Sequence, residues 1–144
     1  MESIYKKMKE NEEYVPISIY DIDHGEANFV IVSENEGNII FSVDCNKKNI
    51  KIEFKGLTPF YMYSEQAMRM ATWSIAQNKN NDKELFKNNI LYIVKNSFLS
   101  NIMELESCGF YSNINLKHYC IVTDQDIVDI LSANDPVVYE QNTP

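Results

Sequence analysis

The chain has 144 residues, of which 44% are apolar and 24% are charged, and this length and composition predict one globular domain with its own hydrophobic core. Its 13 Lys and Arg residues stand against 21 Asp and Glu residues, which gives a formal net charge of −8. Affinity for nucleic acid comes chiefly from Lys and Arg side chains that neutralise phosphates, so this charge argues against a nucleic-acid partner. An acidic surface suits simple solubility or a basic protein partner.

The cysteines and the N-terminal sequence indicate the compartment. Cys45, Cys108 and Cys120 are few and lack CxxC spacing, which fits a reducing environment better than a disulfide framework. Charged residues interrupt residues 1–16 too often for the apolar core of a signal peptide, and no run of about 18 apolar residues follows. We therefore expect a cytoplasmic protein that does not bind membranes.

The first half of the chain is predicted to form strands. Residues 15–23 and the apolar run at 27–34 read as two strands, separated from the next by a hairpin loop. Clean alternation of apolar residues within 38–55 predicts two more strands. An antiparallel meander is therefore expected over residues 15–63, and Gly56 with Pro59 should bend or stop its last strand.

Helices are predicted in the second half. Ser64 is a candidate N-cap for a helix over residues 64–77, and the polar residues 77–89 are expected to form an exposed loop. A second helix is predicted over residues 94–107, with Gly109 as the residue that ends it. The apolar residues at helical spacing in that segment are Val94, Phe98, Ile102 and Leu105.

The last part returns to strands. Residues 116–123 and 126–133 are predicted as strands, although the second segment could instead form a short helix capped by Asp124. Val137 and Val138 are the final apolar pair.

The pattern as a whole predicts an α+β fold. We expect an antiparallel β-meander sheet of about five to seven strands, with one or two helices packed on one face. Residues 1–144 should form a single domain, in which residues 1–14 and 140–144 are peripheral or flexible.

The acidic cluster YDIDHGEANF at residues 20–29 is the first candidate site. Side chains alternate along a strand, so Asp21 and Asp23 share one face while His24 lies on the other. As a calcium loop the segment fails, because Glu26 stands where a Gly is required. We interpret the cluster as an acidic strand end that meets a basic protein surface. The predicted partner-binding residues are Asp21, Asp23, Glu26, Glu34 and Glu36.

A second acidic group contains Asp124, Asp126 and Asp129. It fails the same calcium template, since Asp129 occupies the position of the required Gly, and a turn with Asx hydrogen bonds is favoured.

His118 and Cys120 could form a two-ligand arm with Cys108 as a third ligand. A structural zinc site needs four ligands, so a core Cys and a hydrogen-bonded strand His are the favoured interpretation. The chain contains no GxSxG, GxGxxG, GxxxxGK[ST] or HExxH motif, and we expect no cofactor.

Four short motifs within residues 51–131 resemble those of a loose group of small, mostly uncharacterised bacterial proteins. They lie at Phe54 to Leu57, at Trp73 and Ser74, at Asn96 to Phe98, and at His118 and Tyr119. Some members of this group are encoded beside polymorphic or contact-dependent toxins and are regarded as candidate immunity proteins. The resemblance implies a protein that binds and blocks a cognate toxin, often through an acidic surface that meets a basic nuclease.

The leading functional hypothesis is therefore a non-enzymatic cytoplasmic binding protein, an immunity protein whose acidic surface meets a basic toxin domain. A second hypothesis is a small hydrolase or metal-dependent enzyme that uses Asp21, Asp23, His24 and Glu26. A third is a structural subunit of a homo-oligomer.

Overall fold

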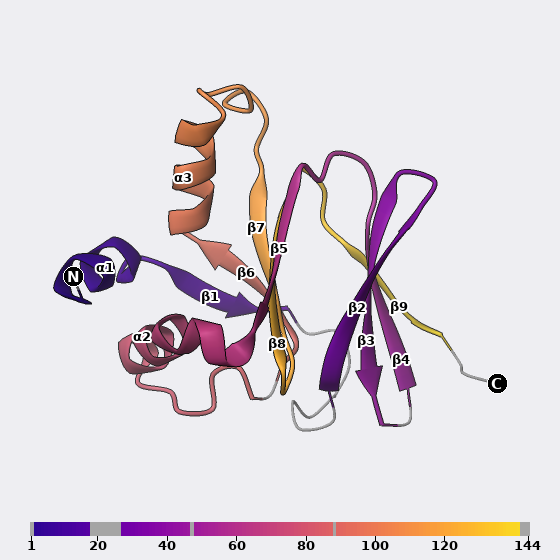
Figure 1. Cartoon of the computed structure of the whole chain (residues 1–144), viewed down its shortest axis with the longest axis horizontal. Helices are drawn as coiled ribbons and strands as arrows, with labels where there is room; N and C mark the ends of the chain where they lie inside the picture. Colours follow the sequence, from indigo (N-terminus) through magenta and orange to yellow (C-terminus); the bar gives the residue numbers. More distant parts are fainter. Residues whose placement is uncertain (1, 18–26, 47, 88, 142–144) are drawn as a thin grey trace.

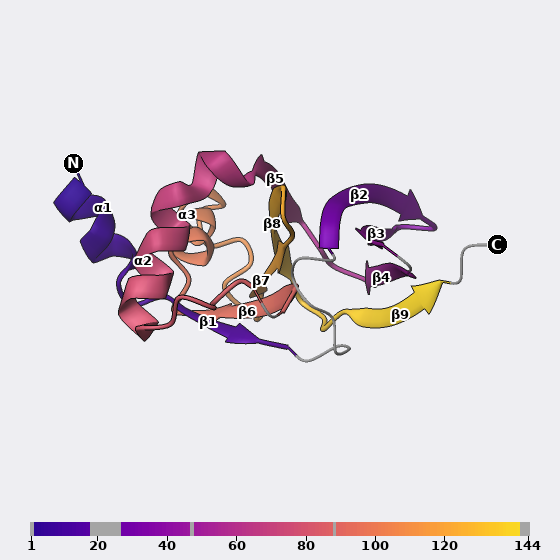
Figure 2. The ribbon, with the colours of Figure 1, turned by 90° about the horizontal axis from the view of Figure 1, so that it is seen from below.

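The computed structural model describes residues 2–17, 27–46, 48–87 and 89–141. Within these ranges, nine strands form two antiparallel sheets, and the helices lie on one side of the larger sheet (Figures 1 and 2). The α+β class with antiparallel pairing is thus confirmed. The elements are α1 Glu2–Lys9, β1 Glu13–Pro16, β2 Ala27–Asn35, β3 Asn38–Cys45, β4 Lys48–Phe54, β5 Phe60–Glu65, the 3-10 helix η2 Gln66–Arg69, α2 Met70–Asn80, β6 Leu91–Lys95, α3 Phe98–Glu106, β7 Lys117–Val122, β8 Asp126–Ser132 and β9 Val137–Gln141.

The smaller sheet has the order β2-β3-β4-β9. Its first three strands form the meander that alternation predicts, and the β2–β3 turn consists of Glu36 and Gly37 with φ values of 53° and 83°. Positive φ at both central residues gives the two-residue turn whose twist matches the flanking strands. This turn fixes the register of the hairpin, so that Asn35 pairs with Asn38.

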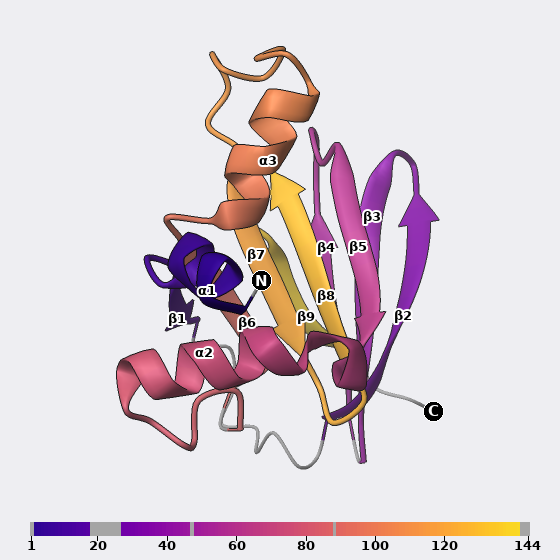
Figure 3. The same ribbon diagram turned by 60° about the vertical axis from the view of Figure 1, so that its left-hand side comes forward.

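The larger sheet has the order β1-β6-β7-β8-β5 and packs one face against the smaller sheet. Fully buried Phe41, Ile52 and Phe54 of the smaller sheet meet Tyr119 and Ile121 of the larger one in this core. The opposite face of the larger sheet carries the helices, and Figure 3 shows α1, α2 and α3 in front of that face. The protein therefore has three layers: the small sheet, the large sheet and the helices (Figure 2).

A second core lies between the large sheet and the helical layer. Phe86 lies at the centre of this core. The centroid of its ring is 5.0 Å from that of Tyr14, 5.2 Å from that of Tyr92 and 4.9 Å from that of Trp73. Such edge and tilted contacts stabilise aromatic clusters beyond simple burial. The residues predicted as an exposed loop, 77–89, thus include one end of α2 and the buried Phe86.

The prediction of one continuous meander is wrong, since β1 and β5 belong to the large sheet. The chain leaves β4 through Gly56, whose φ is +85°, and passes Pro59 before it enters β5. The two residues therefore do end a strand, but they also carry the chain from one sheet to the other. Strands that change sheets in this way build the sandwich instead of extending a single layer.

The helix predicted from residue 94 begins instead at Phe98. Val94 pairs with Tyr14 and His118 in the large sheet, and Asn96, with φ 54°, breaks the chain before Ser97 caps the helix. The β-branched and aromatic residues before Asn96 favour a strand, and a left-handed Asn is a common way to end one element. Gly109 follows α3 with φ 71°, as the sequence predicts.

Two other boundaries differ from expectation. Ser64 lies in β5 and caps nothing, because the chain turns first into η2 and only then into α2. Residues 126–132 form a strand in which every residue is buried, so the alternative short helix is excluded.

The N-terminal segment contains the helix α1 and the buried residues Lys9 and Glu12. At the other end, residues 140 and 141 belong to β9, which pairs with β4. Within the described ranges, none of the helices combines the length and apolar character that crossing a lipid bilayer requires.

Candidate functional site

Four chain connections lie at the same end of the molecule, which we call the loop end. They are the β2–β3, β4–β5, α3–β7 and β8–β9 connections, at the top of Figure 1. Loops that a rigid scaffold holds together are where binding residues commonly lie. The loop end is therefore the favoured location of a functional surface.

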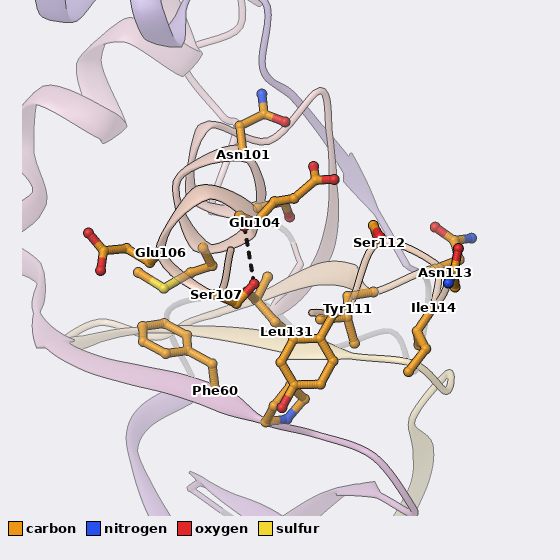
Figure 4. Close-up of a pocket in the computed structure, with 15 residues that line it drawn as sticks. Phe60, Asn101, Glu104, Glu106, Ser107, Tyr111, Ser112, Asn113, Ile114 and Leu131 are labelled. Atoms are coloured by element: carbon orange, nitrogen blue, oxygen red, sulfur yellow. Dashed lines mark hydrogen bonds between the residues drawn. The ribbon is translucent and has the colours of Figure 1, made fainter. Parts of the chain in front are cut away.

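A groove opens at the loop end between α3, the segment that follows it, and the beginning of β5. Its volume is about 610 Å³ (Figure 4). Phe60 of β5 and Leu131 of β8 form part of its lining, together with Met103, Tyr111 and Ile114. Phe60 and Leu131 lie opposite one another across the β5–β8 ladder and face the helical layer. This apolar lining can hold a side chain or short segment of a partner.

Carboxylates border the groove. Glu104 and Glu106 line it from α3, both are exposed, and neither forms an ion pair with a described residue. Leu105 between them is 79% exposed, and Phe110 just beyond the helix is 78% exposed. Large exposed apolar side chains beside charged ones are typical of a surface that meets another protein.

The predicted partner-binding residues fall into two groups. Asp21, Asp23 and Glu26 lie in residues 18–26, outside the described residues, as does His24. Glu34 and Glu36 are exposed on the β2–β3 hairpin, which belongs to the loop end. The structure thus places these two glutamates at the same end of the molecule as Glu104 and Glu106, although they belong to the small sheet and the other two to α3.

A buried polar network lies behind the groove, between the large sheet and the helices. We give this name to the connected side chains of Arg69, Ser97, His118 and Asp129. Ser97 Oγ lies 2.6 Å from His118 Nδ1, His118 Nε2 lies 2.7 Å from Asp129 Oδ1, and Arg69 forms an ion pair with the other oxygen of Asp129. The network therefore joins η2, α3, β7 and β8.

Local structure explains how the network forms. His118 and Asp129 both point from the large sheet toward the helices, because each occupies the same alternate face of its strand as buried Cys120 and Leu131. Ser97 is the N-cap of α3, and its Oγ accepts a hydrogen bond from Ser100 N at 3.0 Å.

The charge of Asp129 is stabilised although the residue is fully buried. Burial by itself raises the pKa of this carboxyl group, but the hydrogen bond from His118, the electrostatic attraction of His118, and the charge and hydrogen bond of Arg69 outweigh burial and lower the pKa to about 2. A carboxylate only accepts hydrogen bonds, so His118 Nε2 carries a proton that it donates to Asp129. The other ring nitrogen, Nδ1, is hydrogen-bonded to the Ser97 hydroxyl.

The order Ser, His, Asp is that of a hydrolytic triad, but the surroundings favour a structural role. Ser97 is only 6% exposed, and neither Ser97 nor His118 lines the groove. The backbone N–H of Phe98, which would face an oxyanion, donates to Glu12 Oε2 at 2.9 Å. Glu12 is paired in turn with Lys9 at 3.2 Å. The network and this pair therefore fix α3, one wall of the groove, against the sheet.

The other residues that the sequence offers as metal ligands have structural roles. The interpretation of His118 as a hydrogen-bonded strand histidine and of Cys120 as a core cysteine is confirmed. Asp126 is also buried, and one oxygen of its carboxylate accepts from Val30 N at 2.9 Å while the other accepts from the Tyr63 hydroxyl. Across the described ranges, no three His, Cys, Asp or Glu side chains gather in a way that could hold a metal ion.

Sequence reasoning missed the groove and the buried network. The carboxylates Glu104 and Glu106 stand on the exposed side of a helix, where charges usually mean only solubility, and the partners of Ser97 are distant in sequence. Ser97 could have been recognised as an N-cap from its position after Asn96. His118 and Asp129 become neighbours only through the strand register.

Comparison with known proteins finds no match: no family model, no curated protein and no solved structure is similar to this chain. The resemblance to candidate immunity proteins therefore stays a prediction.

Proposed function

We propose that this protein is a protein-binding module, and specifically an immunity protein that neutralises a bacterial toxin by binding a basic surface of it. The observation that carries the proposal is the groove at the loop end, with Phe60 and Leu131 in its lining and Glu104 and Glu106 on its border. The overall charge of −8 agrees with a basic partner.

The two kinds of residue in this surface have different roles in binding. Apolar side chains such as Phe60 supply affinity when a partner side chain displaces water from them, and a few such contacts usually dominate an interface. Carboxylates at the border attract a basic partner and raise the association rate more than the final affinity. The protein would thereby cover the active surface of the toxin without any chemical step of its own.

The experiment is a titration of the purified protein against the product of the neighbouring gene, followed by calorimetry and by protection of cells that express that product. Binding with protection is expected. Failure to bind any product of the adjacent genes, at low salt as well as at high salt, would contradict the proposal.

A pair of matched variants locates the binding surface. Glu104→Lys with Glu106→Lys reverses the border of the groove, whereas Glu13→Lys with Glu140→Lys makes the same change of net charge on β1 and β9. All four glutamates are exposed, so each double variant should fold. We expect about tenfold weaker binding for the first variant and little change for the second, because charge complementarity acts at the contact.

A further inference from the structure

The edge of the small sheet offers a second contact with the partner. Among the described residues, β2 pairs only with β3, so its other side is an edge. The beginning of this edge is covered by the β7–β8 turn: Asp124 N donates to Ala27 O at 2.9 Å, and Thr123 Oγ1 donates to Asn28 O at 3.3 Å. Val30 N is the last group to be covered, by the carboxylate of Asp126 at 2.9 Å.

The remainder of the edge is not covered by any residue that the structure describes. The N–H of Val30 points away from β3, because it donates to Asp126. Backbone groups alternate along a strand, so those of Val32 and Glu34 point to the same side. The two-residue β2–β3 turn leads to the same conclusion. It makes Asn35 and Asn38 the hydrogen-bonded pair that closes the hairpin, so the backbone groups of Glu34 and Val32 point outward. No described residue bonds the outward groups of Val32 or Glu34.

The side chains beside this open stretch make it a good template for strand pairing. Ile31 is 57% exposed and Phe29 is 38% exposed, so an added strand would find apolar neighbours. Proteins usually protect such edges with Lys, Pro or a covering segment, and residues 31–35 contain neither Lys nor Pro. The charges that adjoin the open stretch are the carboxylates of Glu34 and Glu36.

We propose that an extended segment of the partner, with Lys or Arg alternating with apolar residues, adds to the small sheet as a strand beside Ile31–Asn35. Backbone hydrogen bonds to Val32 and Glu34 would give affinity, and contacts with Ile31 and Glu34 would select the sequence. The inference rests on the proposed function, because it describes how the same partner binds.

The first experiment uses the full chain and a short synthetic peptide that alternates lysine and valine. In ¹⁵N-labelled protein, the amide signals of Val32 and Glu34 should shift on titration and their hydrogen exchange should slow. Signals of β9, the edge on the other side of the small sheet, should stay unchanged. Absence of any shift along Ile31–Asn35 at saturating peptide would overturn the inference.

The second experiment separates the backbone contact from the charge. Glu34→Pro removes the outward N–H and the carboxylate without breaking a bond to β3, whereas Glu34→Gln removes the carboxylate alone. We expect about tenfold weaker peptide binding for the proline variant than for the glutamine variant, and unfolding curves that show both to be folded. Equal affinity of the two variants would overturn the inference.

The same variants distinguish this inference from the proposed function. If the product of the neighbouring gene binds both Glu34 variants equally, strand addition is wrong and the immunity function stands. If that product does not bind while the peptide still pairs with β2, the edge is a binding site and the proposed partner is wrong.

Discussion

His118 Nε2 lies 2.7 Å from Asp129 Oδ1 in the layer between the large sheet and the helices, and Arg69 holds the other oxygen of the same carboxylate. Because Asp129 is fully buried, its negative charge depends on these two partners. The same histidine contacts Ser97, the residue that caps α3. One buried carboxylate therefore determines where the wall of the groove lies.

Replacing this carboxylate should destabilise the protein strongly. In Asp129→Asn the charge of Arg69 loses its buried partner, and we expect the free energy of unfolding to fall by about 3 kcal/mol. Unfolding in urea measures this loss of stability. Asp135→Asn is the control, since Asp135 pairs with Lys117 at the surface with 71% of its side chain exposed, and about 1 kcal/mol or less is expected there. Equal losses in the two variants would contradict the central place of Asp129.

The lowered pKa of Asp129 predicts an acid transition. The pKa of about 2 lies below the ordinary value of 3.8, so folding favours the charged form. The resulting stabilisation of about 2 kcal/mol is complete above about pH 5 and is lost progressively as the pH falls through 2. The free energy of unfolding, plotted against pH between 5 and 2, should therefore fall more steeply for the wild type than for Asp129→Asn. Parallel curves would exclude this assignment.

Replacing Tyr14 by phenylalanine should not destabilise the protein. The side chain of Tyr14 is 4% exposed, and its hydroxyl oxygen is buried without a hydrogen-bond partner. Removing an unpaired buried hydroxyl should leave the stability unchanged or raise it by up to about 1 kcal/mol. Tyr92→Phe is the matched control, because the hydroxyl of Tyr92 accepts from Phe86 N at 3.0 Å and donates to Asn89 O at 3.3 Å. A loss of about 1 to 2 kcal/mol is expected for that variant, and thermal unfolding compares the two.

A side chain at Gly56, where the chain crosses between the sheets, should reduce the stability of the protein. The φ of Gly56 is +85°, and an added Cβ would lie 2.5 Å from Asn134 Nδ2, which donates to Lys55 O at 2.7 Å. Gly56→Ala should therefore cost more stability than Gly37→Ala, where φ is +83° and nothing lies within 4 Å of the added atom. We expect a difference of about 1 kcal/mol from the crowding alone. The same loss in both variants would mean that only the backbone conformation matters.

Local patterns predicted much of the fold. Alternation identified β3 and β4, and the β-branched run identified β2, because burial on one face imposes a period of two. The sheet that β5 joins could not be predicted, since it depends on where Gly56 and Pro59 send the chain. The sheet that β1 joins could not be predicted either, because its pairing partner β6 is distant in sequence. The helix predicted over residues 94–107 exists, but its start was placed too early, because Val94 of β6 happens to fit the helical spacing of the apolar residues in α3.

The candidate site was less accessible to sequence reasoning. Glu34 and Glu36 were predicted as partner-binding residues; both are exposed at the loop end, and their binding role stays a prediction. The groove was not predicted, since Phe60 and Leu131 are neighbours only through the pairing of β5 with β8. Such non-local contacts leave no periodic signal in either segment.

The most direct measurement of the central claim is the association rate with the product of the neighbouring gene, recorded by stopped flow at low and high salt. Our expectation is a rate that falls steeply with salt for the wild type, and a rate at low salt about tenfold lower in Glu104→Lys with Glu106→Lys than in Glu13→Lys with Glu140→Lys. A rate that is independent of salt and equal in the two double variants would contradict it.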